Sequence, residues 1–224
     1  MNQVVSKKRV ADHGEVYTRA REVNAMLDLV KQETERVESR FLEPACGTGN
    51  FLVEVLERKL RIVESRYKKS QLEYERYAVL AVSSIYGVDI LEDNVCDCRN
   101  RLFYLFDQQY SRLFQKKAKA GCRCVVRYIL ERNIIHGDAL SLQTVGGDSV
   151  PIIFSEWSLV KRSLIKRRDF AFQELLPEEQ SSAPSLFSGS AKPEYSDTGE
   201  KAFIPMPVKE YPLMHFLRIA DVNE

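Results

Sequence analysis

The stretch that most constrains this chain is residues 41–52, which read Phe-Leu-Glu-Pro-Ala-Cys-Gly-Thr-Gly-Asn-Phe-Leu. We expect an apolar strand to run into a turn that contains Gly47 and Gly49, after which Asn50 opens a helix. The first amide groups of a helix have no acceptor within the helix, so they are free to face a ligand. The sequence therefore predicts a strand, a glycine loop and a helix that bind a cofactor.

Two features indicate which cofactor this loop favours. A dinucleotide-binding loop carries a third glycine three residues after the second, where the helix packs on the strand beside a pyrophosphate. Leu52 stands at that position. Glu43, just before the loop, would repel a pyrophosphate but suits the ammonium group of a methionine-like ligand, held directly or through water. The charge favours S-adenosylmethionine over NAD, although a Gly-x-Gly turn alone is equally typical of a tight strand-to-helix connection.

The whole segment is more specific than its two glycines. Residues 42–51 closely resemble the first motif of DNA adenine methyltransferases, the amino-methyltransferases of restriction-modification systems. The resemblance implies an α/β protein with a Rossmann-like, three-layer α/β/α methyltransferase fold that binds S-adenosylmethionine. It assigns cofactor contacts to eight residues of the motif: Glu43, Pro44, Ala45, Cys46, Gly47, Gly49, Asn50 and Phe51.

A second segment that resembles this family lies before the loop. Residues 14–19 read Gly-Glu-Val-Tyr-Thr-Arg, and the corresponding family string closes over S-adenosylmethionine and contacts its carboxylate. The resemblance gives this role to Tyr17 and Thr18, with Arg19 where the family usually has proline. The alternative is that both residues cap the helix that apolar spacing predicts over residues 22–30.

Helices are also predicted over residues 51–63, 71–84 and 91–118, and a strand at residues 85–90 ends with Asp89 and Ile90. A carboxylate at the end of the second strand can accept hydrogen bonds from both ribose hydroxyls of a nucleoside. Asp89 is therefore a cofactor-binding candidate, with Ile90 beside it. The alternative is that Asp89 caps the helix that follows.

The next strand is expected at residues 130–136, where it leads into Gly-Asp-Ala-Leu. This string resembles the third methyltransferase motif. The resemblance implies that Asp138 accepts a hydrogen bond from the adenine amine of the cofactor, with Ala139 beside it, and that His136 is a residue of the rim.

The resemblance breaks at the catalytic motif, which is expected directly after a fourth strand at residues 150–154. The family has Asn, Asp or Ser, then two prolines and an aromatic residue, because a polar group accepts from the target amine and a ring stacks on the base taken out of the duplex. Here the chain reads Ser-Glu-Trp-Ser, so Ser155 and Trp157 are the catalytic candidates. Both prolines are missing, and Glu156 places a charge where the amine would lie. The motif is either divergent or lost, and the alternative for Trp157 is a core residue.

Charge indicates how the chain meets its partners. It carries 33 basic and 32 acidic residues, so no global field attracts nucleic acid. The most concentrated basic segment, residues 160–169, is either a phosphate-contacting patch or a solvated connection. No length remains for a target-recognition domain, so DNA reading is expected to need a separate recognition subunit, together with other restriction or defence subunits. No segment is long and apolar enough for a membrane, and the chain is expected to be cytoplasmic.

Five cysteines are consistent with reduced thiols in a cytosol. The pairs Cys96-x-Cys98 and Cys122-x-Cys124 have the ligand type of a zinc site. Residues i and i+2 of a helix diverge around its axis, so the first pair cannot face one metal. Buried, inert thiols are the preferred interpretation, and no metal site is predicted.

The expected organisation is a methyltransferase-like domain over residues 1–176, a linker or excursion over 177–200 rich in Pro, Glu, Ser and Gly, and a C-terminal segment over 201–224 with edge strands of the same domain. The C-terminal half is expected to be truncated or divergent. By resemblance the chain is a site-specific DNA-methyltransferase acting on adenine. The alternatives are an inactive cofactor-binding subunit of such a complex and a methyltransferase acting on a non-DNA substrate.

Overall fold

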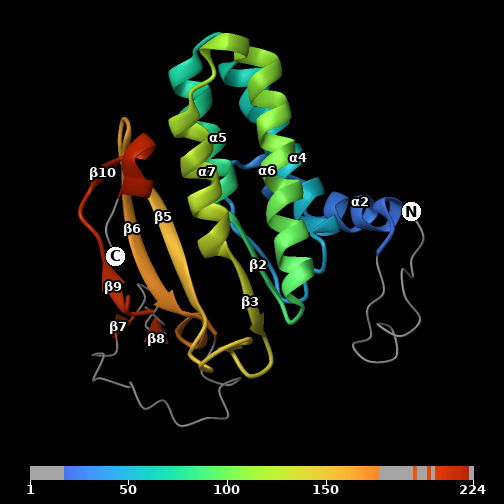
Figure 1. Cartoon of the computed structure of the whole chain (residues 1–224), viewed down its shortest axis with the longest axis vertical. Helices are drawn as coiled ribbons and strands as arrows, with labels where there is room; N and C mark the ends of the chain where they lie inside the picture. Colours follow the sequence, from blue (N-terminus) through green and yellow to red (C-terminus); the bar gives the residue numbers. More distant parts are fainter. Residues whose placement is uncertain (1–17, 177–193, 196–200, 203–204, 222–224) are drawn as a thin grey trace.

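The computed structural model describes residues 18–176, 194–195, 201–202 and 205–221 (Figure 1). Its helices and 3-10 turns are α2 (Ala20–Leu29), α3 (Lys31–Glu35), α4 (Asn50–Tyr67), α5 (Gln71–Ser83), α6 (Glu92–Phe114), η1 (Gln115–Lys117), α7 (Ala120–Asn133), η2 (Phe172–Leu175) and η4 (Phe216–Asp221). Its strands are β1 (Phe41–Glu43), β2 (Ile85–Asp89), β3 (Ile134–Asp138), β4 (Gln143–Thr144), β5 (Ile153–Lys161), β6 (Leu164–Ala171), β7 (Glu194–Tyr195), β8 (Lys201–Ala202), β9 (Lys209–Glu210) and β10 (Met214–His215). Helices and strands are mixed, as expected for an α/β protein.

Three parallel strands form the sheet that carries the glycine loop. β1 pairs with β2 and β2 with β3, in a register that places Glu43 opposite Gly87 and Asp89 opposite His136. β4 runs antiparallel to β3 at one edge of this sheet. Because parallel strands end at the same edge, the residues at the carboxyl ends of β1, β2 and β3 lie together.

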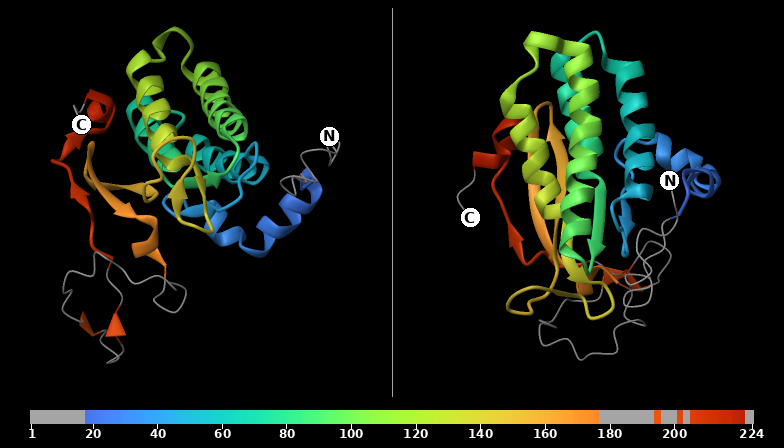
Figure 2. Two further views of the ribbon diagram at one scale, coloured as in Figure 1. Left: turned by 60° about the horizontal axis from the view of Figure 1, so that its bottom comes forward. Right: turned by 45° about the vertical axis from the view of Figure 1, so that its right-hand side comes forward.

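β2 lies at the centre of the molecule. All five of its residues are buried, and it contacts each of the four long helices α4, α5, α6 and α7. These helices extend beyond the sheet as a bundle, visible at the top of Figure 1 and in the right-hand view of Figure 2. Their apolar faces form the larger core because residues such as Leu52, Val55 and Leu56 of α4 recur at helical spacing.

The prediction for residues 130–136 was wrong in its first four positions. α7 continues to Asn133, and β3 begins only at Ile134. The apolar run from Ile129 to Ile135 fits both a buried helix and a strand, so periodicity alone does not place the boundary. The Asn133 side chain marks it in space, because its amide donates to the main-chain oxygens of Ser83 and Ile85 at 3.1 Å each.

Residues 150–171 also differ from the prediction of a fourth strand at 150–154. β5 starts at Ile153, runs to Lys161 and pairs antiparallel with β6 in a second sheet, which β9 and β10 extend. This sheet lies beside α5 and α7 (Figure 2). Hence the described chain does not continue the parallel sheet after β4. A smaller apolar cluster joins the two sheets and contains Tyr86, Val88, Ile152, Phe154 and Phe172.

Two expectations fall wholly or largely outside the described residues. Most of the linker predicted over residues 177–200 lies there; its residues 194–195 form β7, which pairs with β8. Residues 222–224 of the C-terminal segment lie there as well. Among the described residues, no helix combines the length and apolar character that a membrane span requires.

Candidate functional site

The glycine loop follows β1 and opens α4, as the sequence predicts. Gly47 and Gly49 have φ of 52° and 84°, a left-handed conformation that glycine adopts without strain. A Cβ atom on Gly49 would lie 2.6 Å from the Sγ atom of Cys98, so this position also lacks room for a side chain. The loop is anchored by the amide of Cys46, which donates to the Val88 carbonyl of β2 at 2.9 Å. Backbone conformation and close packing therefore both require glycine at position 49.

Asp89 holds this loop to the next helix. Its Oδ2 atom accepts from the amide of Gly47 at 2.8 Å. Its Oδ1 atom accepts from the amide of Leu91 at 2.9 Å and from the side-chain amide of Asn94 at 3.1 Å. Thus the alternative role, a carboxylate bound at the start of α6, is present in the structure. The same contacts bring the ends of β1 and β2 together.

Arg101 fixes the loop from the other side, and the sequence analysis did not identify it. Its Nη1 atom donates to the Thr48 main-chain oxygen at 2.6 Å and to the Asn50 Oδ1 atom at 2.8 Å. Asn94, Cys98 and Arg101 are separated by four and three residues, so they form one stripe of α6 that faces the loop. That spacing was the available signal, but it lay within a helix whose apolar residues dominate the pattern.

Two further carboxylates lie at the carboxyl edge of the parallel sheet. Glu43 ends β1, and burial raises the pKa of its carboxyl. Asp138 ends β3, and its pKa is lowered by hydrogen bonds from the Leu140 amide and from Ser141. Neither residue forms an ion pair within the described ranges, so both retain acceptor capacity for a ligand. His136 bonds to the Ile90 main-chain oxygen at 3.1 Å.

The remaining candidates of this edge surround the loop. Pro44 and Ala45 are exposed on it, and Ile90 is exposed at the end of β2. Thr18 approaches the helix start, since its main-chain oxygen accepts from the Asn50 side-chain amide at 3.4 Å. Tyr17 lies outside the described residues. The other candidates lie at the first turn of α4 and after β3: Phe51 and Ala139, both partly buried.

Ser155 and Trp157 do not lie in a loop after a strand, and the prediction of such a loop was wrong. Both are within β5 and are 2% and 4% exposed. The Ser155 hydroxyl donates to Asp169 at 2.7 Å and accepts from Arg167 at 3.1 Å. The Trp157 indole donates to the Asn133 side chain at 3.1 Å. The alternative interpretation of Trp157 as a core residue is confirmed.

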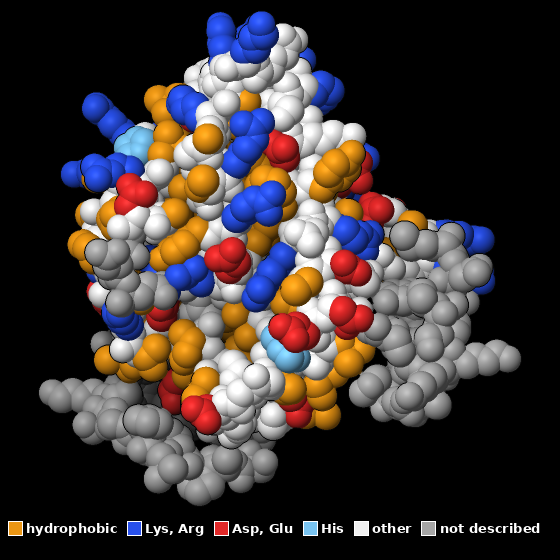
Figure 3. Space-filling view, viewed as in Figure 1, with side chains coloured by type: hydrophobic (Ala, Val, Ile, Leu, Met, Phe, Trp, Pro, Cys, Tyr) orange, Lys and Arg blue, Asp and Glu red, His pale blue; other side chains and the backbone are white. Residues whose placement is uncertain are grey.

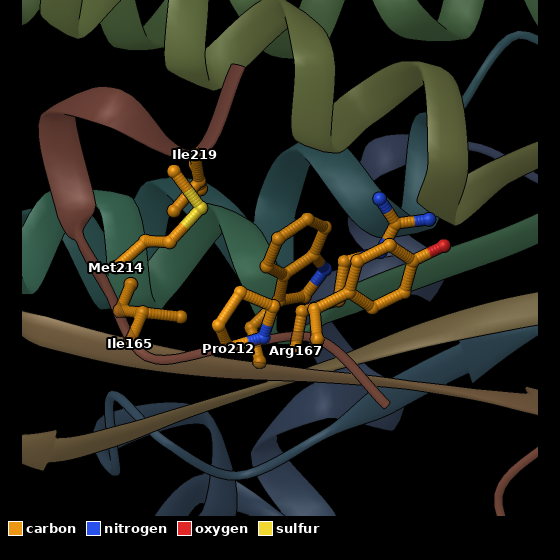
Figure 4. Close-up of a pocket in the computed structure, with 7 residues that line it drawn as sticks. Ile165, Arg167, Pro212, Met214 and Ile219 are labelled. Carbon is orange, nitrogen blue, oxygen red and sulfur yellow. The ribbon is translucent and has the colours of Figure 1, made fainter. Parts of the chain in front are cut away.

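The basic segment 160–169 is likewise part of the second sheet and not a surface patch. The Arg167 guanidinium pairs with Asp169 at 2.7 Å, and the neighbouring Lys166 and Arg168 pair with carboxylates on adjacent strands. A small hollow beside Arg167 is lined by apolar side chains that include Ile165, Met214 and Ile219 (Figure 4). These contacts indicate that the segment stabilises the second sheet.

The cysteines have separate environments. Cys46, Cys98 and Cys122 are buried, whereas Cys96 and Cys124 are exposed. A hydrogen bond with Cys98, together with burial, raises the pKa of the Cys46 thiol, so this thiol stays protonated in the core behind the loop. No group of three or more metal-ligating side chains occurs in the part of the chain that the structure describes.

Comparison with known proteins places the chain in a family. The family model described as "MmeI, DNA-methyltransferase domain" matches residues 17–145, which is more than half of the chain. The match covers the glycine loop, Asp89 and Asp138, and it stops before β5. No curated protein and no solved structure gave a significant match. The chain belongs to the family of MmeI-type DNA-methyltransferase domains, which are methyltransferases of restriction-modification systems.

Proposed function

We propose that this DNA methyltransferase binds S-adenosylmethionine at the carboxyl edge of its parallel sheet and takes part in methyl transfer to the exocyclic amine of adenine. One observation carries the proposal. The structure has a left-handed glycine loop at the start of α4 and three carboxylates, Glu43, Asp89 and Asp138, at the ends of successive parallel strands. Open α/β sheets bind nucleosides at this edge.

The residues present fit an amino-acid-bearing nucleoside. The first turn of α4 offers backbone amides to a carboxylate, and the glycine loop lets the ligand approach the backbone closely. Glu43 provides a negative charge for an ammonium group. Asp138 provides an acceptor for an adenine amine, because its lowered pKa keeps it ionised. When bound, S-adenosylmethionine would supply a methyl group that the sulfonium already activates.

Asp89 has two roles in this proposal. Three protein donors already occupy its carboxylate, at 2.8, 2.9 and 3.1 Å. A carboxylate has about four lone-pair sites, so one remains for a ribose hydroxyl. Its main contribution is therefore to hold Gly47 in place, and hydrogen bonding to the ribose is secondary. We propose Tyr17 and Thr18 as contacts that cover the cofactor from the N-terminal side.

The groups that receive the target amine are not supplied by Ser155 and Trp157, because both are buried and bonded within the second sheet. This observation favours a second candidate function: a subunit that binds the cofactor without completing the reaction alone. In either case methyl transfer depends on positioning more than on a strong base. DNA recognition, and in the second candidate the acceptor groups, would come from other subunits of the restriction-modification complex.

Two measurements test the proposal. Thermal unfolding of the full chain with and without S-adenosylmethionine should show stabilisation that grows with ligand concentration. Transfer of a labelled methyl group to unmethylated DNA, by the chain alone and with the products of neighbouring genes, separates the two candidates. Transfer by the chain alone supports the enzyme, and transfer only in the presence of the other products supports the subunit. An unchanged unfolding temperature at saturating ligand would contradict both.

A further inference from the structure

Two connections that are distant in sequence meet at the free end of the helix bundle. The turn between α4 and α5 carries Arg66, Lys68 and Lys69, and η1 between α6 and α7 carries Lys116 and Lys117. The side-chain amide of Gln71 donates to the Lys117 main-chain oxygen at 2.7 Å, which holds the two connections side by side. We call these five basic residues the bundle tip. Figure 3 shows Lys and Arg side chains gathered at this end of the molecule.

The charges of the bundle tip are not neutralised by the protein. All five side chains are exposed, and none forms an ion pair with another described residue. The acidic side chains of the adjoining helical turns already have partners: Glu64 with Arg112 at 2.6 Å, Glu73 with Arg76 at 3.0 Å, and Glu75 with Lys119 at 2.8 Å. A local positive field therefore remains on a chain whose net charge is only +1.

The bundle tip differs in this respect from the basic segment 160–169. There Lys166, Arg167 and Arg168 each pair with a carboxylate at 2.6 or 2.7 Å. The residues at the tip have no such carboxylates and form no bound cluster among themselves. A surface of unpaired Lys and Arg releases counterions when it meets phosphates, which is the main sequence-independent source of affinity for nucleic acid.

We propose that the bundle tip binds the phosphate backbone of DNA at a distance from the reacting base. α4 has 18 residues and joins the glycine loop to the tip, so the two lie about 27 Å apart at a rise of 1.5 Å per residue. The tip therefore contacts duplex outside the cofactor edge. This inference rests on the DNA-methyltransferase family and does not depend on binding of S-adenosylmethionine.

A structural role for the same residues makes a different prediction. The tip residues follow the carboxyl ends of α4 and α6, where cations stabilise the helix dipole by about 0.3–1 kcal/mol each. Neutralising them would then lower stability and leave DNA affinity unchanged. Stability and DNA binding must accordingly be measured on the same variants.

The test compares two variants of the full chain with equal loss of charge. In the first, Lys68, Lys69, Lys116 and Lys117 are all changed to Gln. In the control, four exposed basic residues elsewhere are changed to Gln: Lys31, Lys161, Arg162 and Lys209. Binding to a labelled duplex is followed by fluorescence anisotropy at several salt concentrations. We expect the tip variant to lose affinity on every duplex sequence, and the slope of log affinity against log salt to fall by about three to four, near one per phosphate contact.

The other outcomes overturn the proposal. Equal losses in both variants would show that only total charge matters, and an unchanged affinity of the tip variant would leave an acidic protein surface as the better partner. No measurable binding of DNA by the wild-type chain would overturn it as well. Thermal unfolding with S-adenosylmethionine separates this result from the proposed function, because the tip variant should keep the wild-type response to the cofactor. If no chain responds to the cofactor while the tip variant alone loses DNA, the tip stands and the cofactor site falls.

Discussion

The two sheets of the molecule accommodate their buried cations differently. In the second sheet, Arg167 is 7% exposed and donates to both carboxylate oxygens of Asp169, at 2.8 and 2.7 Å. Near the start of the parallel sheet, Lys59 is fully buried, and its Nζ atom donates to the main-chain oxygens of Val37 and Ser39 and to the Ser84 hydroxyl. Within the described ranges no carboxylate forms an ion pair with Lys59.

The carboxylates show the same contrast. The second sheet uses Asp169 internally, whereas the parallel sheet leaves Glu43 and Asp138 without ion pairs at its carboxyl edge. A carboxylate that is saturated by buried donors stabilises a fold, and one at the end of a parallel strand can bind a ligand. The comparison therefore assigns structural work to the second sheet and ligand binding to the first.

The largest expected effect is on the second sheet. Asp169→Ala removes the acceptor of Ser155, Arg167 and Tyr211, at distances of 2.7 to 3.0 Å. Breaking a buried ion pair of this kind costs about 3–5 kcal/mol of unfolding free energy. Urea denaturation measures the loss. Glu210→Ala is the matched control, because it removes a surface partner of Lys166 and should cost less than about 1 kcal/mol. Similar losses in both variants would contradict the structural role of Asp169.

The next effect is on the glycine loop. Gly49→Ala places a Cβ atom 2.6 Å from the Cys98 sulfur at a φ of 84°, so strain and overpacking together should cost about 2–4 kcal/mol. Gly121→Ala is the control, since nothing lies within 4 Å of its Cβ position in α7 and helical alanine is favoured by about 0.5–1 kcal/mol. Thermal or urea unfolding of both variants tests the contrast. Equal stabilities would show that the loop tolerates a side chain.

Local patterns sufficed to predict the fold around this loop. The strand that ends in Asp89 and the helices before and after it followed from apolar spacing and turn residues within short windows. The second sheet was missed because its pattern is carried by a pairing. Ser155 looks like a catalytic residue in isolation, but the partner strand brings Asp169 opposite it. Basic side chains in β6 also hide the strand behind the composition of a surface segment.

The candidate site could be predicted only where a motif is contiguous. Asp89 and Asp138 end strands, and their positions relative to the loop follow from parallel order. Arg101 contacts the loop from a different helix, and nothing in its local sequence specifies that contact. The positive surface at the bundle tip was missed for the same reason, because its two halves are far apart in sequence.

A smaller effect is expected on cofactor affinity. Asp138→Asn keeps the size of the side chain but removes its charge, so affinity for S-adenosylmethionine should fall by about 1.5–3 kcal/mol, as for a hydrogen bond to a charged group. Calorimetric titration measures the change. The control is Asp148→Asn in the exposed turn after β4, which should bind like the wild type. An unchanged affinity of the Asp138 variant would remove this residue from the site.

The smallest effect concerns Lys59, the buried cation without a carboxylate. Burial lowers its pKa to about 7, against the opposing influence of Glu38 and Glu33. The unfolded side chain titrates near 10.4, so between these values the unfolded chain holds a proton that the folded chain has released. Stability should therefore rise with pH across this window, by at most about 1.4 kcal/mol per pH unit.

Lys59→Met isolates this contribution because it keeps the length of the side chain without its titration. The unfolding free energy of the wild type minus that of the variant should increase from pH 7 to pH 9.5, below the range in which tyrosines ionise. Three oxygen acceptors surround the Lys59 amine, a number that suits the three donors of an ammonium ion. If they compensate for lost hydration, the difference will stay flat. Lys59 would then be a stable buried charge like Arg167, with main-chain oxygens in place of the carboxylate.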